Sequence, residues 1–277
     1  MLNGALNDDQ LAFLTSHHEN TIQVFKFLNL NKTAEDQLFA IRAIETMRNG
    51  GKVDFIDRII NELTGKALCV YEKLNSSSIG FGNSIKQFDG DFPVSHLTFN
   101  INNSLPSNNY GRTLAPSSFN ITIEMSNTQL NTISDLGAAV SFAHEVIHVE
   151  IFRKMLSAAQ AGDLDPDNMT QQQQITYIQS LKDNFPGLYD YYYMRNNPTW
   201  NHNMMAQHYR NIIADIIEEF NNGSLSRQIY EDISWVGLRV IENFENSVAW
   251  DNLSEIDKTR IQKNINDYFR NGTKNCN

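Results

Sequence analysis

Apolar residues recur every three or four positions through residues 8–64, which is the spacing of helices that bury one face. Thr33 and Asp36 have the spacing of a capping box, in which a hydroxyl and a carboxylate three positions apart begin a helix. A third helix would cover the apolar residues within 55–63 and end before a glycine. The pattern therefore predicts a small module of three helices over residues 1–65.

The pattern changes after residue 65 from helical spacing to alternation. Apolar and polar residues alternate at positions 97–101 and again at 119–125, which predicts two half-buried β-strands. The residues between them, 102–118, are rich in Asn, Ser, Pro and Gly, so we expect a long loop there. Strands at this place could offer a sheet edge with which an extended peptide pairs through its main chain.

One long apolar helix is predicted over residues 134–158, a stretch that contains no proline. Ser134 or Asp135 can cap its N-terminus, because both side chains accept hydrogen bonds from main-chain N–H groups. The helix is apolar nearly all round, so we expect it to be buried. His144 and His148 interrupt this surface one turn apart. Both imidazoles need partners, because an unpaired buried polar group costs about 1–3 kcal/mol.

His144, Glu145 and His148 form the motif His-Glu-x-x-His, in which two imidazole nitrogens can meet one metal ion. A catalytic Zn²⁺ takes three protein ligands and keeps one position open, so a third ligand must come from elsewhere in the chain. Glu145 would lie beside the metal, take a proton from the attacking water and pass it to the leaving amine. The alternative is a pair of satisfied core histidines, since such short motifs also occur by chance.

The first candidate for the third ligand is His202, within a stretch of helical pattern over residues 201–220. At about 100° per residue, His202 falls in the middle of the apolar face, whereas His208 falls on the polar face. An inward histidine in the first turn of a core helix is what a third zinc ligand requires. His208 and the carboxylates of Asp215 and Glu218 remain open as alternatives, because zinc enzymes with this motif also use carboxylate ligands.

Tyr209 falls on the same predicted face as His202, two turns further along the helix. Its phenol could donate a hydrogen bond to the oxyanion that develops on an attacked carbonyl, which would make Tyr209 a catalytic residue. The alternative is a core tyrosine whose only role is packing.

The composition narrows the choice of partners. A net charge of -10 over 277 residues argues against a protein that binds phosphate backbones, because such proteins usually carry a basic patch. No apolar run approaches the length of a membrane span, and the first residues lack the pattern of an export signal. Cys69 and Cys276 have no zinc–thiolate spacing, and whether they pair is left open. We expect a protein or peptide substrate, no nucleic acid and no membrane; the oligomeric state is open.

Six segments within residues 66–271 share features with a known family, namely CVYEKL, SHLTFNI, FNITIEM, AHEVIHVEIFRK, FPGLYDYY and WNHNMMAQHYRNIIADIIEEF. Together they resemble the SprT-like zinc metallopeptidases. Within that group the chain is similar to metallopeptidase domains at the C-terminal ends of large secreted proteins of Bacteroidetes, some of them of the Rhs or polymorphic-toxin type. The resemblance implies zinc bound by His144, His148 and His202, Glu145 as the catalytic base, and a secreted or delivered protein.

Two departures set the chain apart from other enzymes with this motif. SprT-like enzymes that repair protein crosslinks on DNA usually carry the third histidine in a short H-G-x-x-F context close to the first two, and often add basic or zinc-ribbon segments. The present sequence has neither, so we do not expect a role on DNA. The residues after His148, VEIFRK, also lack the continuation found in metzincins.

These observations predict an α+β fold, mostly helical, with a zincin-like metallopeptidase domain over residues 66–277 and a small antiparallel sheet next to the motif helix. The predicted activity is zinc-dependent hydrolysis of peptide bonds. The alternative is a non-catalytic binding or delivery module with a structural or vestigial metal site. Hydrolysis of a non-peptide amide or ester would use the same residues and is also open.

Overall fold

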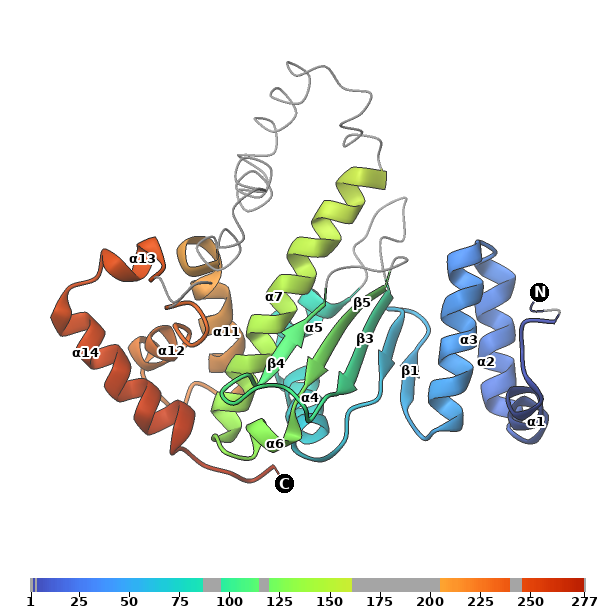
Figure 1. Ribbon diagram of the computed structural model, residues 1–277, viewed down its shortest axis with the longest axis horizontal. Helices are drawn as coiled ribbons and strands as arrows, with labels where there is room; N and C mark the ends of the chain where they lie inside the picture. The colour runs from blue at the N-terminus through green and yellow to red at the C-terminus, as the bar shows by residue number, and fades with distance from the viewer. Residues whose placement is uncertain are drawn as a thin grey trace, which may run out of the picture.

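The chain folds around a central five-stranded sheet, which Figure 1 shows between the N-terminal helices and the remaining helices. This computed structural model describes residues 2, 4–86, 96–114, 120–160, 205–239 and 246–276, without the side chains of 151–160, 207 and 208. The strands are β1 (Lys52–Asp54), β2 (Ile59–Asn61), β3 (His96–Ile101), β4 (Gly111–Thr113) and β5 (Asn120–Met125). The helices are α1 (Asp8–Ser16), α2 (His18–Leu30), α3 (Ala34–Arg48), α4 (Gly65–Ser77), α5 (Ile79–Ile85), α6 (Asn127–Leu130), α7 (Asp135–Gln160), the π-helical η1 (Met205–Tyr209), α11 (Arg210–Phe220), α12 (Arg227–Ile233), α13 (Val248–Asp251), α14 (Glu255–Asn264) and the π-helical η3 (Ile265–Arg270).

The sheet is mixed, with the strand order β1-β2-β3-β5-β4. β1 pairs antiparallel with β2 and β4 pairs antiparallel with β5, whereas β2, β3 and β5 run parallel to one another. The prediction of a mostly helical α+β chain is confirmed, but the prediction of an antiparallel sheet is wrong. Parallel neighbours need a crossover connection, and α4 and α5 supply it between β2 and β3. Alternation of apolar and polar residues marks a half-buried strand but carries no information about its direction.

The N-terminal residues form α1, α2 and α3, and the predicted capping box of Thr33 and Asp36 begins α3. The prediction of a helix over 55–63 is wrong, because residues 55–58 form a turn, residues 59–61 form β2 and residues 62 and 63 follow the strand. Ile59 and Ile60 are both buried, one in the main core and the other against α1–α3. A strand covered on both faces reads as a continuous apolar run, which explains the misassignment. The sheet therefore contains strands from both sides of residue 65, where the sequence predicted a boundary between two domains. The division into these two domains stays a prediction.

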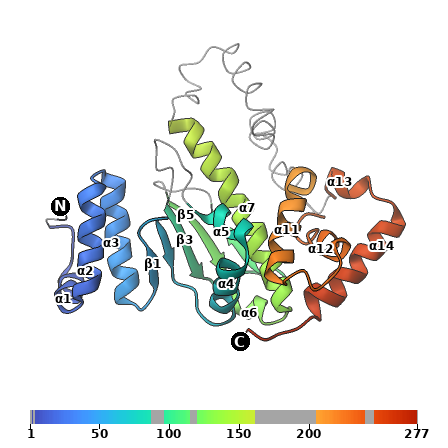
Figure 2. The same ribbon diagram turned by 180° about the vertical axis from the view of Figure 1, so that it is seen from behind.

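The long helix α7 lies in the centre of the main hydrophobic core, between the sheet and α11 (Figures 1 and 2). Its N-terminus is capped by Ser134, whose Oγ accepts a hydrogen bond of 2.8 Å from the main-chain N–H of Gly137. The apolar residues of α7 as far as Val149 are buried, as the sequence predicted. Among the described residues, no helix combines the length and the apolar character needed to cross a bilayer.

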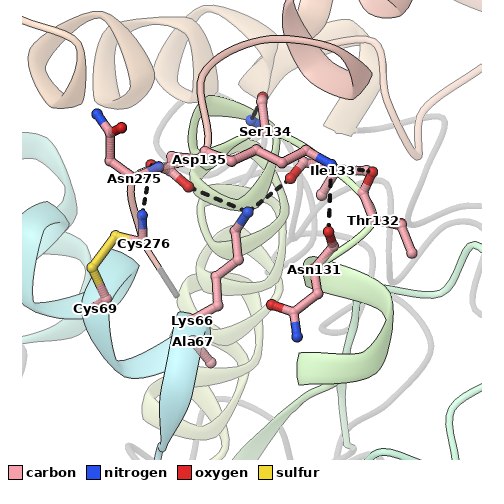
Figure 3. A network of polar contacts seen from close by, with 12 residues as sticks. Lys66, Ala67, Cys69, Asn131, Thr132, Ile133, Ser134, Asp135, Asn275 and Cys276 are labelled. Carbon is pink, nitrogen blue, oxygen red and sulfur yellow. Dashed lines mark hydrogen bonds and ion pairs between the residues drawn. A yellow bond between two sulfur atoms is a disulfide. The ribbon is translucent and has the colours of Figure 1, made fainter.

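The C-terminal residues return to the start of α7, where a disulfide and hydrogen bonds hold them (Figure 3). Cys276 forms a disulfide with Cys69 of α4, which answers the question that the sequence left open. One carboxylate oxygen of Asp135 accepts a hydrogen bond of 3.0 Å from the N–H of Cys276. The other lies 3.2 Å from the buried ammonium of Lys66, which also donates a bond of 2.7 Å to the carbonyl of Ile133. The tail and α4 together therefore hold the first turn of α7.

Candidate metal centre

His144 and His148 lie one turn apart in α7 and direct the same ring nitrogen toward each other. Their Nε2 atoms are 3.2 Å apart. Two nitrogen ligands of a tetrahedral zinc ion, each at about 2.0–2.1 Å from the metal, lie about 3.3 Å from each other. The pair thus has the spacing of two ligands of one ion, and imidazole nitrogen suits zinc. The same distance also fits a hydrogen bond between two core imidazoles, which is the alternative that the sequence left open.

Glu145 lies in the same turn of α7, and its carboxyl group is buried against the edge of the sheet. The hydroxyl of Thr113 in β4 donates a hydrogen bond of 2.7 Å to Oε2 of Glu145. Burial raises the pKa of Glu145 to about 7, and hydrogen bonds from Thr113 act in the opposite direction. A carboxyl group whose pKa lies near neutrality can both accept and return a proton, which is what a general base in hydrolysis has to do.

The edge strand β4 reaches Glu145 because one of its residues has no side chain. A Cβ atom at Gly111 would lie 3.0 Å from Cγ of Glu145 and 2.7 Å from Sδ of Met125. Any larger residue at position 111 would push β4 away from α7, and with it Thr113. Residues 102–118, which the sequence predicted to be loop, therefore contain a short strand beside the motif. Its neighbour in the sheet is β5, with which it pairs in antiparallel register.

The turn that follows α12 packs against the imidazole ring of His144. Gly237 in this turn has a φ of +82°, and a Cβ atom there would lie 2.8 Å from Cε1 and 3.0 Å from Nδ1 of His144. Both the backbone conformation and the close approach require glycine at this position. The main chain of the turn thus limits how far the imidazole of His144 can rotate.

The structure brings together two of the predicted ligands and leaves the third untested. His202 and the side chain of His208 lie outside the described residues. Among the residues that are described, no group of three or more His, Cys, Asp or Glu side chains is arranged to hold a metal ion. Asp215 and Glu218, the carboxylate alternatives, instead both form ion pairs with Arg227. In the described residues neither carboxylate is grouped with the histidine pair, and the identity of the third ligand stays a prediction.

Tyr209 is buried in the main core at the end of η1. The described apolar residues that were predicted to point inward from this helical stretch are all buried, whereas His202 lies outside the described residues. Burial agrees with both interpretations of the side chain, so its role as a donor to the oxyanion stays a prediction. The buried residues on this face are Met205, Ala206, Tyr209, Ile213, Ile216 and Phe220.

Three residues at this site were not found from the sequence, namely Thr113, Gly111 and Gly237. Thr113 and Gly111 lie in a segment whose composition is that of a loop, and three residues are too few for alternation to be visible. Gly237 interrupts a stretch of otherwise helical pattern. An isolated glycine in such a pattern is a recognised sign of a break, and it was the one available signal.

Comparison of the chain with family models, with curated proteins and with solved structures finds no match.

Proposed function

We propose that this chain is a zinc-dependent metallopeptidase with a zincin-like arrangement, in which His144 and His148 hold the metal and Glu145 is the general base. The observation that carries the proposal is the distance of 3.2 Å between the two Nε2 atoms, with a buried carboxyl group in the same turn. His202 is the proposed third ligand and lies outside the described residues. The same set of residues would also serve the hydrolysis of other amides or esters.

Each residue of the motif has a chemical task in this proposal. Zinc, when bound, would polarise the scissile carbonyl and make a water molecule more acidic. Glu145 would accept the proton of the attacking water and deliver it to the leaving nitrogen, so that the peptide bond breaks into a carboxylate and an amine. Tyr209 is the proposed donor to the oxyanion. The buried surroundings of Glu145 strengthen its interactions with nearby charges, because little water screens them.

The position of β4 supports a peptide as the substrate. β4 is the last strand of the sheet, and no described strand pairs with its outer side. Its residue Thr113 contacts Glu145, so a chain that pairs with this edge would run past the general base. Main-chain pairing of this kind binds extended peptides of varied sequence, while pockets for side chains would set any preference.

The disulfide supports the proposal of a secreted or delivered protein. Cys69 and Cys276 are joined, and disulfides persist in oxidising surroundings but are rare in a reducing cytosol. This agrees with what the resemblance to domains of secreted proteins implies. We propose that the chain works outside the cytosol in which it is made.

The proposal is tested by metal content and peptide hydrolysis measured on the same preparations. The purified chain should contain about one zinc ion and cleave casein or a peptide library, and a chelator should abolish cleavage. Glu145→Gln should keep zinc and lose hydrolysis, because the amide cannot accept the proton. His148→Ala and His202→Ala should both lose zinc, since each removes a ligand.

Three outcomes would overturn the proposal. Hydrolysis by Glu145→Gln at the wild-type rate would exclude Glu145 as the base. A wild-type chain that binds no zinc would favour the satisfied core histidines instead. Zinc held by four protein ligands, together with no hydrolysis of any peptide, would favour the non-catalytic binding or delivery module, because a closed coordination shell has no position for a reacting group.

A further inference from the structure

Thr113 links the edge of the sheet to the carboxylate of Glu145, mainly through its side-chain hydroxyl and also through its main chain. Its hydroxyl oxygen lies 2.7 Å from Oε2 of Glu145 and 3.0 Å from the main-chain oxygen of the same residue. Both distances are those of hydrogen bonds. A glutamate side chain has three rotatable bonds, so a fixed donor on its carboxylate removes much of its freedom.

The hydroxyl of Thr113 is held in place by the sheet and not by α7. Thr113 is paired with Ile123 of β5, and the next residue, Leu114, donates a main-chain hydrogen bond of 2.8 Å to Thr122. Threonine is branched at Cβ, which leaves its hydroxyl few positions once the strand is fixed. The carboxylate of Glu145 is therefore held from outside the helix that carries it.

We infer that Thr113 is a positioning residue for Glu145, which it holds in the orientation needed to accept the proton of the attacking water. This inference rests on the proposed function and adds to it a residue outside the motif. Rate depends steeply on the placement of the base, because a displacement of about 1 Å can cost about 100-fold. Loss of the hydroxyl should therefore lower kcat without weakening the binding of the peptide or of zinc.

The kinetic test compares Thr113→Val, which keeps the shape of the side chain and loses the hydroxyl, with Thr113→Ser, which keeps the hydroxyl. Thr113→Val should lose about 10-fold or more in kcat with an unchanged KM and an unchanged zinc content. Thr113→Ser should stay within about 3-fold of the wild type. Thr98→Val is the matched control, because it removes a threonine hydroxyl bonded to Asn120 on another strand of the sheet.

A second measurement tests the contact without using activity. The unfolding temperature of the metal-free protein is compared for Thr113→Val, Glu145→Leu and the double variant. If the two side chains interact, Thr113→Val should lower the unfolding temperature in the wild type and have a much smaller effect in the Glu145→Leu background. Equal shifts in both backgrounds would show that there is no such interaction, and the inference would fail.

The two measurements separate failure of this inference from failure of the proposed function. If the wild type hydrolyses peptides and Thr113→Val has the wild-type kcat, the positioning role is wrong and the proposed function stands. If Thr113→Ser loses as much kcat as Thr113→Val, the hydroxyl is not what matters, and the role is again wrong. If the unfolding data show coupling but the zinc-loaded wild type cleaves nothing, the proposed function is overturned, and the catalytic role of Thr113 with it.

Discussion

Gly237 lies so close to His144 that a Cβ atom on the glycine would be 2.8 Å from Cε1 of the imidazole. The two residues are far apart in the sequence, and they meet because the turn after α12 packs over the motif helix. Real Cβ atoms do not approach other atoms so closely, so any side chain at 237 has to displace either the turn or the ring. The glycine thus fixes the place of a proposed metal ligand from outside the motif.

Gly237→Ala should weaken zinc binding by about 10–100-fold, as loss of a residue that orients a metal ligand typically does. The measurement is a zinc titration against a competing chelator. Gly223→Ala is a matched control, because Gly223 also has a positive φ of +60° but has no atom within 4 Å of its added Cβ. If both variants weaken zinc binding equally, backbone strain and not contact with His144 is the cause.

Removal of the disulfide between Cys69 and Cys276 should cost about 2–5 kcal/mol of stability, because the bridge closes a loop over a sequence separation of 207 residues. Cys276→Ser and Cys69→Ser should unfold at the same lower temperature. A reductant should lower the unfolding temperature of the wild type toward theirs and leave both variants unchanged. A wild type that is insensitive to the reductant would mean that the bridge does not support the fold.

Lys66→Met should destabilise the chain by about 3–5 kcal/mol, because it leaves the buried carboxylate of Asp135 without its cation. The measurement is chemical unfolding by urea. Lys52→Met is the control, since the ion pair of Lys52 with Glu72 is exposed and worth about 1 kcal/mol or less. If both variants lose a similar free energy of unfolding, the buried ion pair of Lys66 with Asp135 stabilises the chain no more than an exposed one, and the prediction is wrong.

The stability of the chain should fall as the pH is lowered from about 6.5 to about 4 because of His96. Burial, followed by the charge of Arg58, lowers the pKa of His96 to about 4, whereas an unfolded histidine titrates near 6.5. The unfolded chain therefore takes up a proton that the folded chain refuses, which costs up to about 3 kcal/mol at pH 4. Nearby Asp36 acts in the opposite direction on this pKa.

His96→Phe isolates this contribution. The ring of His96 is stacked on Phe39, with centroids 4.7 Å apart, and phenylalanine preserves an aromatic ring there without a titrating group. Urea unfolding at pH 7 and pH 4.5 should show a smaller loss of stability in this variant than in the wild type. His18→Gln, which changes an exposed histidine, should lose as much stability as the wild type does.

Much of the local structure could be predicted from the sequence, because periodicity and capping depend on residues close together in the chain. The capping box at Thr33 and Asp36, a cap at Ser134 or Asp135 and the buried faces of α7 and α11 were found in this way, and the structure decides for Ser134. The pairing of His144 with His148 followed from one turn of helix. These are short-range relationships, which the helical repeat alone fixes.

The sequence by itself determined the helical turn from His144 to His148, the long helix that contains this turn and the mostly helical character of the chain. Only the tertiary structure decided the directions of the strands, the use of residues 111–113 as an edge strand and the joining of Cys69 to Cys276. It also decided which residues meet the motif from outside, namely Thr113 and Gly237. The physical reason is that these contacts join residues tens to hundreds of positions apart, and no local pattern of apolar and polar residues records which distant segments will pack together.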